Sequence, residues 1–184
     1  MSDIGFRVLT QLGDSTSVRS KDGRRPLARV GQIQTPHGTI ETPAFIPVGT
    51  KATVKSVLPE AMSDLGAQAV LANAYHLYLQ PGPDIVEAAG GVGKFMSWPG
   101  PTFTDSGGFQ VMSLGVGFKK VLAMDATTVR SDDVIAAGKE RLAHVDDDGV
   151  TFKSHLDGSL HRFTPEISMQ VQHQIGADII FAFD

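Results

Sequence analysis

Apolar and polar positions alternate along the first part of the chain and then give way to short, continuous apolar runs. Residues 29–35 and 39–42 alternate on either side of a turn at Pro36-His37-Gly38, a pattern that predicts a β-hairpin. Residues 43–48 are a short apolar run that predicts a buried strand leading into a loop. We therefore expect a small antiparallel β unit over residues 1–42, with a second unit over residues 43–184.

A helix followed by a continuous apolar strand occurs twice in the second unit. Residues 58–65 predict a short helix that ends at Gly66, and an apolar run follows to residue 73. Residues 175–184 repeat this order, because a helix ends at Gly176 and an apolar run then finishes on a polar residue. Continuous apolar strands that follow helices are typical of parallel sheets buried on both faces.

The helix before the second of these strands carries clear starting signals. Thr164 is suited to the N-cap and Pro165 to the first helical position. Ile167, Val171 and Ile175 then recur every four residues, which places them on one face of a helix.

A further strand is predicted at residues 101–105, whereas residues 115–163 interrupt the strand–helix pattern as an insertion. Within the insertion we expect two strands, an acidic helix and two turns: strands at 119–124 and 150–154, the helix at 132–144, and turns at 146–149 and 157–158. The repeated strand–helix units still predict an α/β fold with a parallel sheet, either open or closed into a barrel.

Polar side chains stand at the ends of three predicted parallel strands. They are Asn73, Asp105 and Asp184. In a closed barrel the catalytic residues lie at the carboxyl ends of the strands, so these three side chains predict a site on that face.

Composition narrows the class of protein. The chain has 184 residues, of which 41% are hydrophobic and 20% charged, and this balance is typical of a globular domain. There is no apolar run of the ~18 residues that a membrane-spanning helix needs, and the first residues do not resemble a signal peptide. The absence of cysteine excludes disulfides and thiolate metal sites within this chain and is compatible with the cytoplasm.

The net charge of −4 does not indicate a nucleic-acid-binding protein, but the charges are unevenly distributed. Residues 1–30 are rich in arginine and lysine, and residues 131–150 are acidic. The basic stretch suits contacts with phosphate, while a solvated surface is the simpler interpretation.

The sharpest candidate site begins at Asp105, which closes an apolar strand where an unpaired carboxylate is costly. Gly107 and Gly108 allow backbone N–H groups to turn towards a ligand, and Phe109 and Gln110 offer a ring face and an amide. The alternative is a tight turn with a capping carboxylate and a core phenylalanine.

Other polar residues have two interpretations each. Asn73 and His76 suit sugar hydroxyls or phosphate, whereas a lone histidine such as His76 more often has a structural role. Asp184 is able to accept two hydrogen bonds from adjacent N–H donors such as a guanine edge, or it is a frayed end. The histidines lack the spacing of a metal site, and we expect His155 and His161 on a hairpin rather than on a metal.

Five segments together resemble the tRNA-guanine transglycosylase (queuine tRNA-ribosyltransferase) family. They occur in the family order and cover most of residues 30–184: Phe45–Thr50 (FIPVGT), Asn73–Gly82 (NAYHLYLQPG), Phe103–Leu114 (FTDSGGFQVMSL), Ser154–Glu166 (SHLDGSLHRFTPE) and Gly176–Asp184 (GADIIFAFD). Residues 115–150 fit less well and are longer than the family usually carries there.

The resemblance implies the N-terminal portion of a (β/α)8 barrel of the TIM type, preceded by a small antiparallel sheet. It implies exchange of guanine in tRNA for a 7-deazaguanine, with Asp105 as general acid/base and Asp184 reading the guanine edge. The base pocket would be lined by Ser106, Gly107, Gly108 and Phe109. The ribose-phosphate of the target nucleotide would lie near Thr50, Lys55, Asn73 and His76.

The resemblance also implies that the family's aspartate nucleophile and its structural zinc site lie beyond this chain, so we expect no cofactor here and no activity from the chain alone. An alternative is a binding or assembly module that works as a homodimer or with a complementing chain. A weaker alternative is another barrel enzyme acting on a nucleoside or a sugar phosphate.

Overall fold

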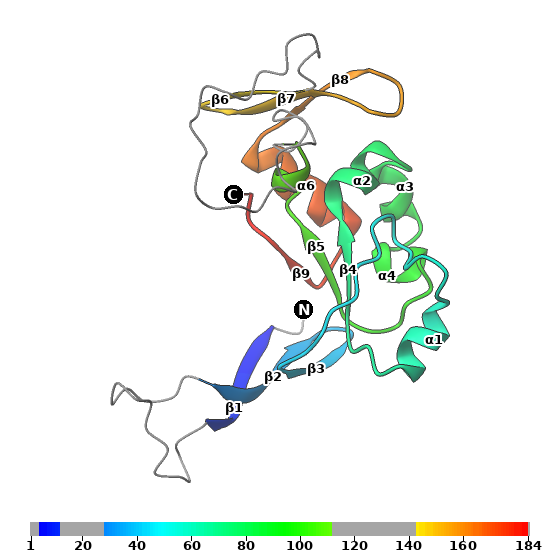
Figure 1. The fold of residues 1–184 in the computed structure, drawn as a ribbon, viewed down its shortest axis with the longest axis vertical. Helices are drawn as coiled ribbons and strands as arrows, with labels where there is room; N and C mark the ends of the chain where they lie inside the picture. Colours follow the sequence, from blue (N-terminus) through cyan, green and yellow to red (C-terminus); the bar gives the residue numbers. More distant parts are fainter. Residues whose placement is uncertain (1–3, 12–27, 112–142, 184) are drawn as a thin grey trace, which may run out of the picture.

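The computed structural model describes residues 4–11, 28–111 and 143–183, which form three small sheets with helices around the middle one (Figure 1). The strands are β1 (Gly5–Gln11), β2 (Arg29–Thr35), β3 (Gly38–Thr42), β4 (Val70–Asn73), β5 (Thr102–Asp105), β6 (Ala143–Asp146), β7 (Gly149–Lys153), β8 (Leu160–Phe163) and β9 (Ile179–Ile180). The helices are α1 (Pro59–Asp64), α2 (Ala74–Leu79), α3 (Pro83–Ala88), α4 (Val92–Phe95) and α6 (Pro165–Ile175).

The N-terminal sheet is antiparallel, in the order β1-β2-β3. The hairpin expected around Pro36-His37-Gly38 is confirmed, since β2 pairs with β3 and Ile33 lies opposite Ile40. Ile40 is almost fully buried against Ala69 and Phe103, so this sheet packs on the middle one. The division of the chain at residue 42 stays a prediction.

The middle sheet is parallel, in the order β4-β5-β9, and supplies the frame for the candidate site. Asn73 lies directly opposite Asp105 in the β4–β5 register, because both strands end at the same level. β9 pairs with the other edge of β5 through Ile179 and Ile180. The predicted strands that end at residues 73 and 105 are confirmed.

The strand predicted at residues 43–48 is wrong as a buried strand. Only Val48 makes a bridge, to Leu71 of β4, and the side chains of Phe45 and Val48 are 85% and 53% exposed. Pro43 and Pro47 have no N–H to donate to a ladder, which keeps the segment at the edge of the sheet.

The helices predicted at residues 58–65 and after Thr164 are confirmed. α1 ends just before Gly66, which has a φ of +85°. The Thr164 side chain caps α6 by accepting a hydrogen bond from the Ile167 N–H at 3.3 Å, and Pro165 opens the helix. Val171 and Ile175 are buried on one face of α6, as their spacing predicts.

The third sheet is an antiparallel meander, β6-β7-β8, at the opposite end of the molecule from the N-terminal sheet (Figure 1). It confirms the strand expected from residue 150 and both predicted turns. The helix expected at 132–144 is wrong at its end, because Ala143 and His144 pair with β7 and Ala143 is buried. Residues 132–142 and the strand expected at 119–124 lie outside the described residues.

A salt bridge and an aromatic cluster hold this sheet together and onto the helices. Arg162 binds both carboxylate oxygens of Asp146 at 2.6 Å, and these hydrogen bonds hold the pKa of Asp146 well below its usual range. Phe152 and Phe163 are fully buried and stack with ring centroids 5.7 Å apart. They belong to the same core as Leu77, so the meander packs against α2.

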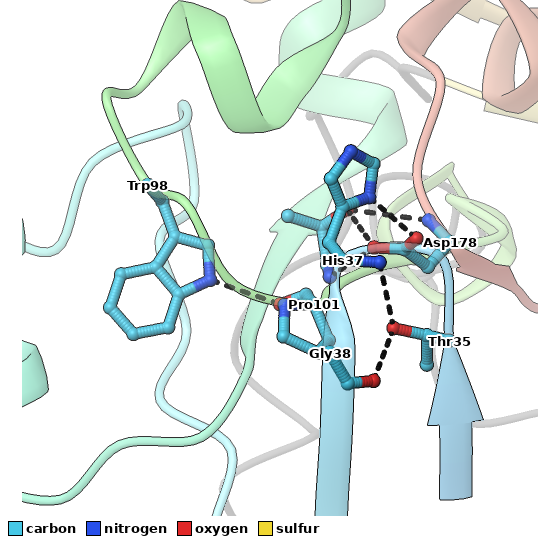
Figure 2. A network of polar contacts seen from close by, with 7 residues as sticks. Thr35, His37, Gly38, Trp98, Pro101 and Asp178 are labelled. Atoms are coloured by element: carbon cyan, nitrogen blue, oxygen red, sulfur yellow. Dashed lines mark hydrogen bonds and ion pairs between the residues drawn. The ribbon is translucent and has the colours of Figure 1, made fainter.

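A polar network ties the N-terminal sheet to the amino-terminal ends of β5 and β9 (Figure 2). Asp178 has a side chain that is 1% exposed, and its Oδ1 lies 2.7 Å from Nδ1 of His37. Its Oδ2 accepts hydrogen bonds from the N–H and the hydroxyl of Thr102, and the indole N–H of Trp98 donates to the Pro101 carbonyl nearby. The candidate site therefore lies at the end of the parallel sheet opposite this anchor.

Candidate active site

The carboxylate of Asp105 is held by three donors at the carboxyl end of the parallel sheet. Its Oδ1 accepts a hydrogen bond from the Ala74 N–H at 2.9 Å, and its Oδ2 accepts hydrogen bonds from the Asn73 amide and, at 3.1 Å, from the Gln110 amide. The parallel register of β4 and β5 makes this possible, since it sets Asn73 beside Asp105. The structure thus brings together two of the three strand-end residues.

Asp105 stays partly exposed while its orientation is fixed. A carboxyl group in that situation suits general acid/base chemistry, because it stands in one orientation and a proton donor or acceptor is able to approach it. Sequence analysis singled out Asn73 for sugar or phosphate; the structure shows that its amide also orients Asp105.

The turn after β5 is built from local hydrogen bonds. Ser106 is buried, its Oγ accepts from the Gly108 N–H at 3.2 Å, and its carbonyl accepts from the Ser168 hydroxyl at 2.7 Å. Gly107 has a φ of +78°, and a Cβ there would stand 3.2 Å from Cβ of Tyr75. The turn therefore needs glycine at 107, and the Gly108 N–H expected to face a ligand is bonded within the turn.

Phe109 projects from this turn with 60% of its side chain exposed. The core phenylalanine that was the alternative interpretation is therefore wrong. The exposed ring is available to stack on a planar ligand, as the first interpretation requires, although stacking itself stays a prediction.

Two tyrosine–histidine pairs fasten the β7–β8 hairpin to α2. The Tyr75 hydroxyl lies 3.2 Å from Nδ1 of His155, and the Tyr78 hydroxyl lies 3.0 Å from Nδ1 of His161. Burial raises the pKa of both tyrosines. The two histidines do lie on a hairpin, as expected; sequence analysis missed their tyrosine partners, whose spacing of three residues on a helix was the available signal.

His76 lies between this hairpin and Asp105. Its Nδ1 is buried and makes no hydrogen bond to any residue that the structure describes. Burial lowers the pKa of His76, electrostatic repulsion from the neighbouring His155 and Lys51 lowers it further, and the negative charge of Asp105 opposes them. The neutral ring is therefore favoured near neutral pH, which leaves its nitrogens suited to hydrogen bonding with a neutral ligand group.

We expect His76 to titrate below the ordinary histidine pKa of about 6.5. Because the unfolded chain then binds the proton more readily, this histidine contributes stability at neutral pH that is lost as the pH falls below the unfolded pKa. Replacing Lys51 by glutamine should raise the pKa of His76, since a repelling charge is removed, whereas Asp105→Asn should lower it. NMR titration of the His76 ring measures both shifts; opposite signs would contradict this electrostatic account.

The remaining predicted site residues differ in whether the structure places them beside the Asp105 carboxylate. The Thr50 carbonyl accepts from the Asn73 N–H at 3.3 Å, so Thr50 borders the site. Lys55 is exposed, and among the described residues it has no hydrogen bond or ion pair with Asp105 or with its partners Asn73, Ala74 and Gln110. Lys51, which sequence analysis missed, lowers the pKa of His76 through its charge and donates to Gln80 at 2.9 Å. Asp184 lies outside the described residues.

A cavity of about 220 Å³ opens beside the turn after β5, close to the acidic β6–β7 turn. It is lined by Gly108, Val111, Val145, Asp146, Asp147, Asp148, Gly149, Val150, Pro165 and Phe183. The lining includes Gly108 of the turn after β5 and residues 145–150 of the meander, but none of the three donors to Asp105. The cavity therefore lies next to the candidate site, on the side of the meander.

Two kinds of feature are absent from the described residues. No helix there is both long and apolar enough to cross a membrane. Within the same ranges, no three histidine or acidic side chains are grouped so as to hold a metal ion.

Comparison with known proteins gives a consistent result. Residues 24–184 match the family model described as "Queuine tRNA-ribosyltransferase". The chain is 51% identical over 157 residues to the protein of that name from Herpetosiphon aurantiacus, covering 85% of this chain and 34% of the relative. It is 49% identical over 164 residues to the protein of that name from Moorella thermoacetica, covering 89% of this chain and 37% of the relative.

A third relative, from Gloeobacter violaceus, is 48% identical over 168 residues, covering 91% of this chain and 37% of its own length. The chain thus spans a little over a third of the length of the curated relatives that it matches. The matched residues include β4 and β5, which carry Asn73 and Asp105. By sequence, the chain belongs to the queuine tRNA-ribosyltransferase family.

Proposed function

We propose that this chain is part of an enzyme that replaces a guanine base in tRNA by a 7-deazaguanine through retaining ribosyl transfer. The observation that carries the proposal is the Asp105 carboxylate, oriented by Asn73, Ala74 and Gln110 at the end of a parallel sheet in a chain of this family. The family relationship supplies the reaction, and the geometry supplies a group suited to one part of it.

Asp105 is assigned the movement of protons. In a retaining exchange, a carboxylate attacks the anomeric carbon and the bond to the departing base breaks, so that base must gain a proton at a ring nitrogen. The incoming base loses a proton from its ring nitrogen as the new bond forms. One carboxyl group that gives the first proton and takes the second serves both steps.

The turn after β5 is assigned to the base. Ser106, Gly107, Gly108 and Phe109 would line its pocket, with the exposed ring of Phe109 stacked on the purine face. Asp184 would accept hydrogen bonds from the two adjacent N–H donors of the guanine edge. A base that has left the anticodon stack needs both kinds of contact, because it has lost its stacking and its pairing partners.

Residues at the end of β4, on α2 and in the segment before α1 are assigned to the ribose-phosphate. They are Thr50, Lys55, Asn73 and His76. Support comes from the Thr50–Asn73 hydrogen bond and from the buried, unbonded Nδ1 of His76, which is the kind of group that a ligand satisfies.

We also propose that the parallel sheet is the first part of a (β/α)8 barrel. The bridge at Val48 followed by β4, β5 and β9 places successive strands side by side in chain order, as in a barrel wall. An open doubly wound sheet would instead reverse its strand order.

We propose that the enzyme is soluble and that it acts in the cytoplasm. The family's nucleophile and structural zinc site would come from sequence outside residues 1–184, or from a complementing chain. A homodimer is a further possible form of the assembly.

Transfer of labelled guanine into tRNA tests the function. We expect the complete gene product to exchange guanine and the chain of residues 1–184 alone to give none, because no residue here is assigned as the nucleophile. Exchange by residues 1–184 alone would show that the nucleophile lies within them. No exchange by the complete gene product, with tRNA and base supplied, would overturn the proposed function.

A further inference from the structure

We propose that Gln172 is a positioning residue that fixes the two strand ends flanking the site, and this inference rests on the proposed function of Asp105. Gln172 lies on α6 and is fully buried. Sequence analysis counted only the apolar face of this helix, yet a fully buried amide has to find partners for its oxygen and its nitrogen. Those partners define its role.

The amide of Gln172 pairs with the backbone of Phe181 just beyond β9. Its Nε2 donates to the Phe181 carbonyl at 2.8 Å, and its Oε1 accepts from the Phe181 N–H at 3.2 Å. The ladder between β5 and β9 pairs only two positions, the last of them Thr104 with Ile180. Where the β5–β9 ladder ends, the Gln172 side chain therefore supplies the hydrogen bonds to the backbone of Phe181.

The same amide oxygen reaches the strand that carries Asp105. Gln172 Oε1 accepts from the hydroxyl of Thr104 at 2.9 Å, and Thr104 is also fully buried. The Phe181 N–H also donates to the Thr104 carbonyl at 3.1 Å. The Gln172 side chain thus links Thr104, the residue before Asp105, to Phe181, which lies three positions before Asp184.

Ser168 completes this arrangement one helical turn earlier. Its hydroxyl donates to the Ser106 carbonyl at 2.7 Å, and it accepts a longer contact of 3.4 Å from Gln172 Nε2. Residues 168 and 172 lie on the same face of α6, since they are four positions apart. The helix therefore holds the residues on both sides of Asp105, Thr104 through its hydroxyl and Ser106 through its carbonyl.

Positioning matters here because a fixed carboxyl group must meet a base that is itself held in place. A displacement of about 1 Å at a catalytic group can lower a rate by about a hundredfold. Leucine at 172 keeps a similar volume but cannot pair with Phe181 or Thr104. The ends of β5 and β9 would then be joined by the two-position ladder without the amide of Gln172, while Ser168 still holds the Ser106 carbonyl.

The test compares Gln172→Leu with Gln174→Leu in the complete gene product. Gln174 lies on the same helix, but its amide donates to Asp84 on α3, away from the strand ends. We expect Gln172→Leu to lower kcat for guanine exchange about a hundredfold with the KM for tRNA changed by less than about twofold. We expect Gln174→Leu to match the wild type. Equal kcat values for two folded variants would overturn the proposal.

A second variant keeps the test decisive if leucine prevents folding. Gln172→Glu retains an acceptor for Thr104, but its ionised carboxylate faces the Phe181 carbonyl without a hydrogen to donate. Protonation restores that donor, so its kcat relative to wild type should rise as the pH falls. A pH profile parallel to that of the wild type would contradict a positioning role.

Amide hydrogen exchange separates this proposal from the proposed function. We expect faster exchange at residues 104–106 and 179–181 in Gln172→Leu than in Gln174→Leu, whether or not the protein acts on tRNA. Unchanged protection there would overturn the role of Gln172. An inactive wild type with the expected loss of protection would instead overturn the proposed function and leave Gln172 as the residue that holds the strand ends.

Discussion

Replacing Asp105 by alanine in the complete gene product is expected to lower guanine exchange by about 10²–10⁴-fold, the contribution of a positioned general acid/base. The reason is that no other acceptor replaces the carboxylate between the Asn73 amide and the Ala74 N–H. Labelled guanine incorporation into tRNA measures the loss. A rate within tenfold of the wild type would show that Asp105 is not the acid/base.

Two controls keep this result interpretable. Asp64→Ala removes an exposed carboxylate at the end of α1 and should leave exchange unchanged. Asp105→Ala also leaves the Ala74 N–H and two amides without their acceptor, which should cost about 1–3 kcal/mol of unfolding free energy. Thermal unfolding therefore has to show that the variant is still folded at the assay temperature.

The largest effect on stability is expected for Gly149→Ala, at the start of β7. Gly149 has a φ of +154°, and a Cβ there would stand 2.2 Å from the Phe163 carbonyl oxygen. The neighbouring atom belongs to backbone, so relief requires β7 and β8 to move apart. We expect a loss of about 3 kcal/mol, measured by urea denaturation, from overpacking together with backbone strain.

Gly158→Ala in the β7–β8 turn is the matched control. Gly158 also has a positive φ, of +75°, but nothing lies within 4 Å of the Cβ that alanine would add. Only the backbone strain remains, and we expect a loss of about 1 kcal/mol. Equal losses at the two positions would show that the close approach of Phe163 does not matter.

The local elements that sequence analysis predicted correctly are those with strong short-range signals. The N-cap at Thr164, the glycine stops at Gly66 and Gly176, and the hairpin turn at Pro36-His37-Gly38 depend on a few neighbouring residues. Backbone geometry at a cap or a turn is set mostly by those neighbours, so pattern alone was enough.

The errors occurred where long-range packing decides. Residues 43–48 have the composition of a buried strand, yet two prolines and an edge position leave a single bridge at Val48. Ala143 and His144 continue a predicted helix, but pairing with β7 makes them a strand. A short segment adopts the structure of its partner when its own preference is weak.

By itself, the sequence determined the helices and strands with local signals, the parallel character of the central strands, and the presence of a carboxylate at a strand end. The family motifs are also a property of the sequence alone. These features follow from neighbouring residues and from hydrophobic periodicity, which do not depend on which distant segments meet.

Only the tertiary structure decided how the site is held. The donors on Asp105 come from another strand, from the start of α2 and from the turn that follows, and Gln172 reaches two strand ends from α6. The burial of His76 and its neighbours His155 and Lys51, which lower its pKa, likewise depend on segments far apart in sequence. Hydrogen bonds and electrostatic interactions depend on distances in space, and those distances are set when the sheets and helices pack together.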